Sequence, residues 1–251
     1  MNAGLSRLSL FSPCKIHVFL RITSKRPDGF RDLASLFHVI SIGDKIKFSF
    51  SPSKSIDHLS TNVPRIPLDE RNLFFLSVQI MKALNLYRKK TGSDKYFWVH
   101  VDKRVPTGVG LGGGSSNAAT ALWAANQFIG GLATEKELLE WSGDIGSDVP
   151  FFFSNGAAYC TGRGEIVEDI PSPLPLDLPM VLIKPPQACS TAKVYKATLG
   201  QIVGQKLGVG RKTAELLSKK TQQTNASRPT GKNINKPKSC KIFGTEIKKT
   251  T

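Results

Sequence analysis

Cysteine is scarce in this chain, and no long apolar run occurs. The 4 cysteines stand at positions 14, 160, 189 and 240, without the short paired spacings of zinc sites or disulfide-rich scaffolds. We therefore expect neither a zinc cluster nor a disulfide framework, and a reducing compartment suits such a chain. No apolar stretch approaches the roughly 18 residues of a membrane-spanning helix, so we expect no such helix and no membrane partner.

Acidic residues are also few. The 251 residues include 19 Asp and Glu against 35 Lys and Arg, a formal net charge of +16. Residues 201–251 alone hold 12 Lys and Arg against 2 Glu, and apolar residues become rare after Leu217. Polar, strongly charged segments of this kind are typical of disorder. The basic excess is therefore mainly a property of the tail and indicates little about the rest of the chain.

Glycine, in contrast, is concentrated at one place. Residues 108–114 contain five glycines in seven positions, which allows backbone N–H groups to approach a bulky anion. A β-favouring run, Phe97–Val101, precedes this loop. A run of helix formers, Asn117–Ala125, follows it, with Ser115 as the expected N-cap. A strand, a glycine loop and a helix N-terminus in this order predict a site for a nucleotide phosphate.

Three common phosphate loops do not fit this segment. Gly108, Gly110 and Gly113 match the pattern G-x-G-x-x-G. However, a dinucleotide-binding fold needs a second strand with an acidic end, and here Thr134 and Glu137 begin a helix with a capping box instead. The lysine of a Walker A loop and the downstream motifs of a protein kinase are missing. A glycine-rich surface turn is the other alternative, although each glycine costs about 1 kcal/mol in conformational freedom.

The stretch Pro106–Ala119 resembles the ATP-binding motif of the GHMP kinases, the galacto-, homoserine, mevalonate and phosphomevalonate kinases. Three further segments resemble the same family, in the right order: Ser12–Leu20, Arg26–Arg31 and Asp144–Phe152. Together they are similar to the plant plastid type of the branch that acts on 4-diphosphocytidyl-2-C-methylerythritol in the non-mevalonate isoprenoid pathway. This resemblance, from about residue 5 to about residue 196, implies the α+β fold of the GHMP kinase N-terminal domain, which also occurs as the second domain of a small-subunit ribosomal protein.

The resemblance implies ATP and Mg²⁺ as cofactors and phosphorylation of the 2-hydroxyl of that small molecule. It also implies that Asp148 is the catalytic base and Lys15 its electrostatic partner, since phosphoryl transfer needs a positioned hydroxyl and neutralised charge. The residues by themselves leave open that Asp148 caps a turn and that Lys15 is a solvated surface lysine. The triphosphate would lie on a loop of eleven residues: Pro106, Thr107, Gly108, Val109, Gly110, Leu111, Gly112, Gly113, Gly114, Ser115 and Ser116.

Four residues bear on recognition of the substrate. In the family, an aromatic residue and a histidine contact cytosine where this chain has Phe30 and Arg31. Phe30 keeps a ring that stacks on a base, whereas Arg31 only donates where an imidazole both donates and accepts. His17 stands where the family usually has asparagine. Tyr195 resembles a second aromatic face for cytosine, with half-buried packing as the alternative.

The remaining pattern is mixed α/β. Alternation over 46–50 predicts a strand, and residues 69–72 open an amphipathic helix. Two helices follow the glycine loop, and short strands are expected near 157–160 and 179–183, with Asp148 at a strand edge. A Pro-rich connection follows residue 170. We expect three regions: an ATP-binding domain (1–170), the start of a C-terminal lobe (171–200) and a basic tail (201–251).

Beyond Gly200 the resemblance stops. No second glycine-rich motif of the Gly-Ser-Gly-Ser type is present, so we expect an incomplete C-terminal lobe. Residues 207–217 resemble a helix-hairpin-helix element, a weak signal for nucleic acid as a partner. The segment 1–8, which precedes the expected start of the fold, is too short for a plastid transit peptide. The resemblance therefore suggests the plastid stroma, and the cytoplasm stays open.

Three hypotheses follow. The chain is a working small-molecule kinase, a nucleotide-binding remnant impaired at Arg31, His17 and the second lobe, or a nucleic-acid-binding protein acting through its tail.

Overall fold

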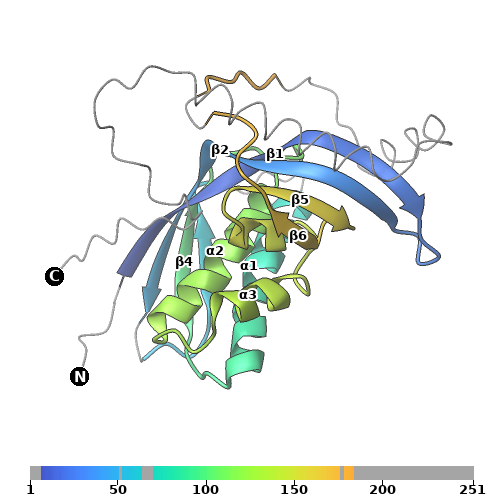
Figure 1. Cartoon of the computed structure of the whole chain (residues 1–251). Coiled ribbons are helices and arrows are strands. Elements are labelled where there is room, and N and C mark those ends of the chain that lie inside the picture. Colours follow the sequence, from blue (N-terminus) through green and yellow to red (C-terminus); the bar gives the residue numbers. More distant parts are fainter. Residues whose placement is uncertain (1–6, 51–52, 64–69, 176–177, 184–251) are drawn as a thin grey trace, which may run out of the picture. The chain divides into compact units, whose positions relative to one another are not determined.

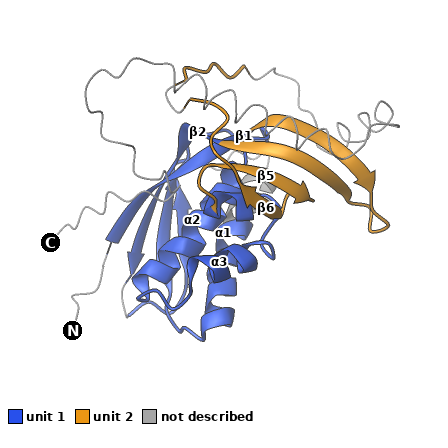
Figure 2. Ribbon diagram, viewed as in Figure 1, with its two compact units in different colours: residues 1–16, 39–153, 241–251 blue, residues 17–38, 154–240 orange. Residues whose placement is uncertain are grey.

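A computed structural model describes residues 7–50, 53–63, 70–175 and 178–183, with the backbone alone for 70–77. The elements in chain order are β1 (Arg7–Lys25), β2 (Arg31–Phe50), β3 (His58–Thr61), α1 (Glu70–Thr91), β4 (Phe97–Asp102), α2 (Gly113–Phe128), α3 (Glu135–Ser142), the 3₁₀ helix η1 (Pro150–Phe153), β5 (Ala157–Gly162) and β6 (Ile166–Asp169). Two compact units divide them (Figure 2): unit 1 holds the described residues of 1–16 and 39–153, and unit 2 those of 17–38 and 154–240. Strand β1 pairs with β2, and each contributes to both units.

The sheet of unit 1 has a buried and an open face. Strand β2 pairs antiparallel with β4, with Phe50 opposite Phe97, and β4 pairs in parallel with β3. Successive side chains of a strand point to opposite faces. Accordingly, Phe97, Val99 and Val101 are buried, whereas Trp98 between them is 52% exposed. The strand predicted from the β-favouring residues of 97–101 is confirmed, and its buried face forms part of the core.

The helices of unit 1 gather beside β4 (Figure 1). Helix α1 packs against α2, and both α2 and α3 contact η1. Residues 116–126 of α2 are buried throughout, and most of them are small, which lets neighbouring elements approach closely. The Tyr87 hydroxyl donates to Asn126 Oδ1 at 3.1 Å and joins the two long helices. Unit 1 therefore holds α2, the helix that follows the glycine loop, at the centre of its core.

Unit 2 has a smaller core of its own. Strand β2 pairs antiparallel with β5 from Leu33 opposite Gly162 to His38 opposite Ala157, and β5 pairs antiparallel with β6. Ala34, Leu36 and Tyr159 are buried together in this unit.

Several predictions about the elements are confirmed. The strand before the glycine loop and the long helix that includes the buried Ile80 and Leu84 both form. The capping box also forms: Thr134 Oγ1 accepts from Glu137 N at 3.2 Å, and Glu137 Oε2 accepts from Thr134 N at 2.8 Å. No helix in the described ranges is long and apolar enough to cross a bilayer.

Three local predictions are wrong. The N-cap of helix α2 lies three residues before the predicted one, because Gly112 takes a left-handed conformation (φ 68°) as N-cap and Ser115 lies in the first turn. Residues 179–183 form no strand, and Val181 is 87% exposed, so no strand of the described residues covers this apolar run. Asp148 precedes the 3₁₀ helix η1 rather than a strand. Successive side chains of a strand point to opposite faces, whereas the helical turn lets the neighbours Phe151 and Phe152 both be buried.

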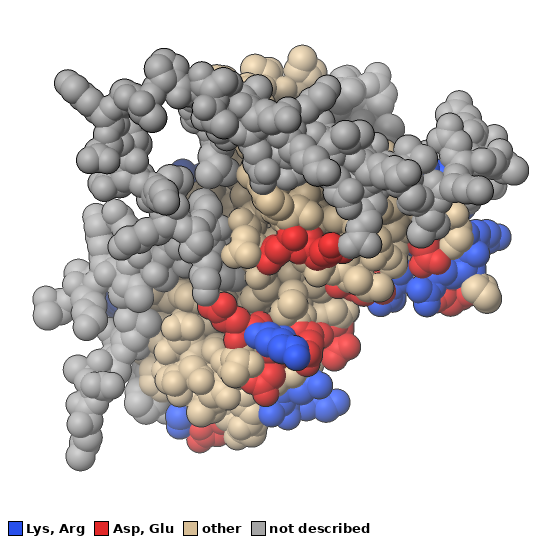
Figure 3. Space-filling view, in the orientation of Figure 1, with Lys and Arg blue, Asp and Glu red and all other residues tan. Residues whose placement is uncertain are grey.

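The boundaries expected at residues 170 and 200 stay predictions, and the tail lies outside the described residues. On the face drawn in Figure 3, acidic and basic side chains of the described part are interspersed. The described part of that face therefore shows no broad basic patch of the kind that binds nucleic acid.

Candidate functional site

The glycine loop connects β4 to α2 in unit 1. Gly108, Gly110 and Gly112 have φ values of 71°, 77° and 68°, a region that side chains other than glycine rarely adopt. At Gly112 space is limiting too: a Cβ atom would lie 3.0 Å from Lys15 Cγ and 3.1 Å from Lys15 Cε. The glycine at this position is therefore required both by the turn and by the lysine packed against it.

Three contacts hold the loop against β1. Lys15 N donates to Leu111 O at 2.9 Å, so the loop backbone continues the hydrogen bonding of the strand. The hydroxyls of Ser12 and Ser116 are 2.8 Å apart, one on β1 and one in the first turns of α2. Leu111 also packs on a buried cluster that includes Cys14. The loop is thus restrained although its glycines impose little conformation of their own.

The N-terminus of α2 is suited to an anion. Its N-cap, Gly112, offers no side-chain cap, and its first turn contains no acidic residue. The aligned peptide dipoles place about half a positive charge at such an end, together with N–H groups that lack partners within the helix. Loop amides and helix N-terminus therefore form a cradle of the type that holds phosphate groups.

Lys15 and Asp148 meet beside this cradle. Lys15 Nζ lies 3.3 Å from Asp148 Oδ2, and the lysine side chain is 1% exposed whereas the aspartate side chain is 34% exposed. The interpretation of Lys15 as a solvated lysine is therefore wrong. Asp148 has an ion-pair partner that its interpretation as a turn cap does not explain. The pair combines a buried positive charge with a carboxylate that solvent and small molecules can reach.

The loop that carries Asp148 is fixed on both sides. Val149 N donates to Gly146 O at 3.1 Å and closes a turn around Asp148. After it, the buried Phe152 reaches the glycine loop, since its ring atom Cζ would be 3.3 Å from a Cβ on Gly112. The apolar residues of η1 thus hold the carboxylate next to the cradle.

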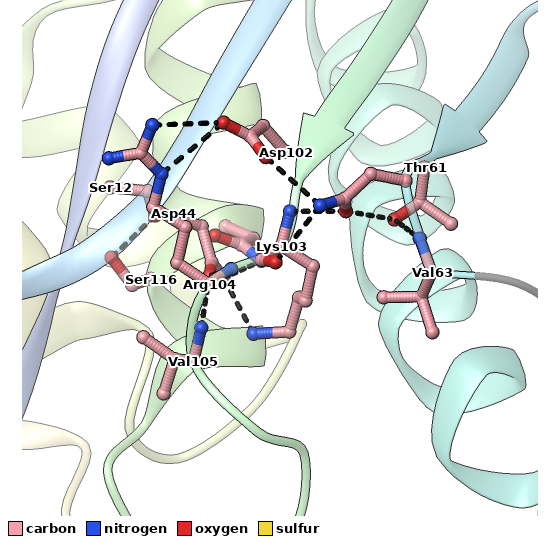
Figure 4. Close-up of polar contacts among 11 residues, drawn as sticks. Ser12, Asp44, Thr61, Val63, Asp102, Lys103, Arg104, Val105 and Ser116 are labelled. Atoms are coloured by element: carbon pink, nitrogen blue, oxygen red, sulfur yellow. Dashed lines mark hydrogen bonds and ion pairs between the residues drawn. The ribbon is translucent and has the colours of Figure 1, made fainter.

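A buried carboxylate behind the loop was not predicted from the sequence. Figure 4 shows Lys103, Arg104 and Val105 converging on Asp44 of β2. Lys103 Nζ donates to Asp44 Oδ2 at 2.7 Å, and the side chains are 6% and 0% exposed. The one signal in the sequence was that Asp44 is the single acidic residue of 33–50 in β2.

Cys14 lies next to this group. A Cβ on Gly113 would be 3.7 Å from Cys14 Sγ and 3.9 Å from Asp44 Oδ2. Burial, with a smaller contribution from the Asp44 carboxylate, raises the pKa of the Cys14 thiol from 9.0 to about 11, against the opposing charge of Lys103. The thiol is therefore neutral at physiological pH and serves the packing behind the loop.

Two of the residues predicted for substrate recognition lie at one hairpin of unit 2. Phe30 follows the turn at Gly29, and the residue is 55% exposed. The guanidinium carbon of Arg163 lies 5.3 Å from the centroid of that ring. Nε of Arg31 is buried without a hydrogen-bond partner. Phe30 thus offers an exposed ring to a planar ligand, while Arg31 has a donor that remains unused.

His17 has partners within unit 2. Its Nδ1 is 2.8 Å from Ser35 Oγ, and its ring meets Phe37 edge-on at 4.6 Å. These two contacts fix the orientation of the His17 imidazole. Tyr195 lies outside the described residues.

The described side chains include no group of three or more His, Cys, Asp or Glu that could hold a metal ion. Mg²⁺ is commonly bound through substrate phosphates with one or two carboxylates. The donors present fit that mode, in which the phosphates carry the ion and Asp148 is the acidic group beside the cradle.

Comparison with known proteins supports a kinase family. Residues 79–156 match the model of the GHMP kinases N terminal domain. The chain is 79% identical over 195 residues to the 4-diphosphocytidyl-2-C-methyl-D-erythritol kinase, chloroplastic/chromoplastic, of Solanum lycopersicum, covering 78% of this chain and 47% of that one. The chloroplastic kinase of the same name from Arabidopsis thaliana is 75% identical, with 49% of its length covered. The chain thus spans about half the length of these plant relatives.

A bacterial relative is covered more fully. The 4-diphosphocytidyl-2-C-methyl-D-erythritol kinase of Persephonella marina is 35% identical over 197 residues, which cover 78% of this chain and 68% of that one. A crystal structure of 4-(cytidine 5'-diphospho)-2C-methyl-D-erythritol kinase matches with a TM-score of 0.51 and 27% identity over 65% of this chain and 55% of that chain. The mevalonate pyrophosphate decarboxylase of Streptococcus pyogenes shares the fold, with a TM-score of 0.60 at 14% identity over 88% of this chain and 71% of that chain.

Proposed function

The chain belongs to the 4-diphosphocytidyl-2-C-methyl-D-erythritol kinases, within the GHMP kinases, and on this premise we propose that it transfers the γ-phosphoryl group of ATP to the 2-hydroxyl of 4-diphosphocytidyl-2-C-methyl-D-erythritol. The observation that carries the proposal is the Lys15–Asp148 pair at 3.3 Å, with Lys15 packed against Gly112 at the start of α2. Phosphoryl transfer to an alcohol requires a group that accepts the hydroxyl proton and a site that holds the phosphates. Lys15 contacts both, because it pairs with Asp148 and packs against the cradle at Gly112.

The loop residues 106–116 would hold the triphosphate through backbone N–H groups and the N-terminus of α2. Mg²⁺, bound with the phosphates, would neutralise charge on the group being transferred. Asp148 would accept the proton of the substrate hydroxyl, whose oxygen forms the new bond to the γ-phosphorus as the bond to ADP breaks. Lys15, 1% exposed and 3.3 Å from Asp148 Oδ2, would orient the carboxylate and place positive charge near the developing negative charge.

In the same proposal, Phe30 stacks on the cytosine of the substrate. Support comes from its 55% exposure and from the Arg163 guanidinium near its ring, because a ring held in place loses less freedom on stacking. The plastid is the proposed compartment, supported by the chloroplastic plant relatives. ATP, Mg²⁺ and a small-molecule substrate are the proposed partners.

The experiment that tests the proposal measures ADP release from Mg-ATP with and without the diphosphocytidyl substrate. We expect substrate-dependent release, and we expect Asp148→Asn to lower kcat by about 10²- to 10⁴-fold because a general base contributes that much. The affinity for ATP should stay nearly unchanged. Asp144→Asn is the matched control, since this exposed aspartate lies in the same loop, and it should turn over normally.

Normal turnover of Asp148→Asn would reject the aspartate as base. A second candidate function, a nucleotide-binding protein without kinase activity, is favoured by Arg31, whose Nε is buried without a partner at the position of the family's histidine. In that case the chain binds ATP, and the substrate causes no release of ADP. Arg31→His would then be expected to restore some release.

A further inference from the structure

We infer that Asp44 is a positioning residue that sets the geometry of the phosphate loop from behind. The inference rests on the proposed function in one respect, namely that the loop binds the phosphates of ATP. Asp44 lies in the C-terminal half of β2, and its side chain is 0% exposed. A carboxylate in such a place is retained only where hydrogen-bond donors surround it, because burying an unpaired charge is costly.

Four donors meet the two carboxylate oxygens. Oδ1 accepts from the backbone N–H groups of Arg104 and Val105, at 2.9 and 3.0 Å. Oδ2 accepts from Lys103 Nζ at 2.7 Å and from Asn117 Nδ2 at 3.0 Å. Every one of these donors comes from the segment that contains the glycine loop or from its immediate flanks (Figure 4 shows the first three).

The positions of the donors give the contact its consequence. Arg104 and Val105 are the last two residues before the loop begins at Pro106, and Asn117 lies in α2 just after the loop ends. One side chain from another strand therefore fixes the entry and the exit of the loop relative to each other. The glycines between these ends cannot do so themselves, because they restrict the backbone least.

Asp44 also determines where a cation lies. Lys103 Nζ would be 3.5 Å from a Cβ on Gly113, the first residue of α2. Without the carboxylate, the ammonium would be a buried unpaired charge beside the helix N-terminus and would move or draw in water. Asp44 thereby keeps both the backbone of the loop ends and the buried Lys103 ammonium in one arrangement.

Asp44→Asn tests the role with almost no change in shape. The amide oxygen can still accept from the two backbone N–H groups, but the new NH₂ then faces the donors of Lys103 and Asn117. We expect ATP to bind at least about tenfold more weakly, and kcat/KM to fall by up to about 100-fold, the cost of a misplacement of about 1 Å. Amide hydrogen exchange of residues 104–117, measured without nucleotide, should become faster.

Asp57→Asn is the matched control. Asp57 is 1% exposed and accepts from Phe97 N at 2.8 Å and Arg88 Nη2 at 2.6 Å, so it too is a buried carboxylate bound to a cation and a backbone amide, at the opposite end of β4. A general loss of stability would affect both variants alike. The inference requires that Asp57→Asn leave ATP affinity and exchange of the loop unchanged.

The exchanged pair Asp44→Asn with Asn117→Asp provides the rescue. In it the amide at position 44 can accept from the backbone and donate to the new carboxylate at position 117, so ATP affinity and slow exchange should return in large part. Equal effects of Asp44→Asn and Asp57→Asn, or unchanged exchange of the loop in Asp44→Asn, would overturn the inference. If the unaltered chain bound no ATP, the proposed function would fail, and the role of Asp44 in positioning a phosphate loop would fail with it. Faster exchange of residues 104–117 in Asp44→Asn would in that case show only that Asp44 holds the two ends of the loop together.

Discussion

At the scale of single residues, the site combines groups whose properties come from burial. Lys15 is 1% exposed, and its partner Asp148 is 34% exposed, so the positive charge is held inside while the carboxylate faces the medium. Gly112 leaves the space that Lys15 occupies. Cys14, which directly precedes Lys15 in β1, fills the core behind the loop as a neutral thiol. Each residue type is thus explained by what it touches.

The burial of Cys14 predicts a sensitivity to alkaline pH. Burial raises the pKa of the Cys14 thiol from 9.0 to about 11, so between these values the unfolded chain has lost the proton while the folded chain keeps it. The contribution of the buried thiol to the free energy of unfolding is therefore fully present below pH 9. It falls as the pH rises toward 11, by about 2–3 kcal/mol in total. Urea unfolding from pH 8 to 11 should show a steeper decline for the unaltered chain than for Cys14→Ala. Equal slopes would contradict the prediction.

At the scale of elements, helix ends decide where side chains are placed. Helix α3 begins with a complete capping box between Thr134 and Glu137. Hydrogen bonds from Thr134 also hold the pKa of Glu137 below its usual value, so this cap is present at neutral pH and weakens as the pH falls into the acidic range. Helix α2 begins on Gly112 with no side-chain cap. The N-terminus of α3 thus satisfies its backbone N–H groups with its own side chains, whereas the N-terminus of α2 leaves its N–H groups available to an anion.

Removing the cap of α3 should destabilise the chain modestly. Thr134→Ala is expected to lower the free energy of unfolding by about 1 kcal/mol, because it removes the acceptor for Glu137 N and one donor to its carboxylate. Lys136→Ala on the same helix is the control, since its side chain is 84% exposed, and a change below about 0.5 kcal/mol is expected. Urea unfolding at pH 7 measures both, and the two variants behaving alike would argue against the cap.

At the scale of the whole molecule, ligand binding and folding are linked. The residues of the cradle come from β1, the glycine loop, α2 and the loop before η1, all within unit 1. A ligand bound to all of them stabilises the folded state over the unfolded state, in which they are separated in sequence. The same reasoning applies to any nucleotide whose phosphates match the cradle.

Mg-ATP should therefore raise the melting temperature. At 100 times its Kd it adds about 2.7 kcal/mol, which corresponds to about 5–10 °C for a chain of this size. Asp148→Asn should keep this shift, whereas Gly112→Ala should lose most of it, because the new Cβ would press on Lys15 Cγ at 3.0 Å. Thermal unfolding with and without nucleotide gives the measurement, and an unchanged melting temperature in saturating Mg-ATP would reject the cradle.

Local pattern in the sequence determined the glycine loop, the strand before it, the helices around it and the family. These features depend on residue type and spacing within about twenty positions, so they can be recognised before any folding is considered. Where local signals competed, the prediction was wrong, as at Ser115, which is a good N-cap by type but lies behind a glycine able to take φ 68°.

Tertiary structure decided what the sequence alone could not. Lys15 was compatible with a solvated lysine until β1 placed it under Gly112 and beside Asp148. Asp44 gave almost no signal, because its four donors lie between 59 and 73 residues further along the chain. Burial and charge pairing depend on which distant segments the fold brings together. The sequence by itself therefore determined the kind of site, and the packing of β1, β2 and α2 determined which side chains hold it in place.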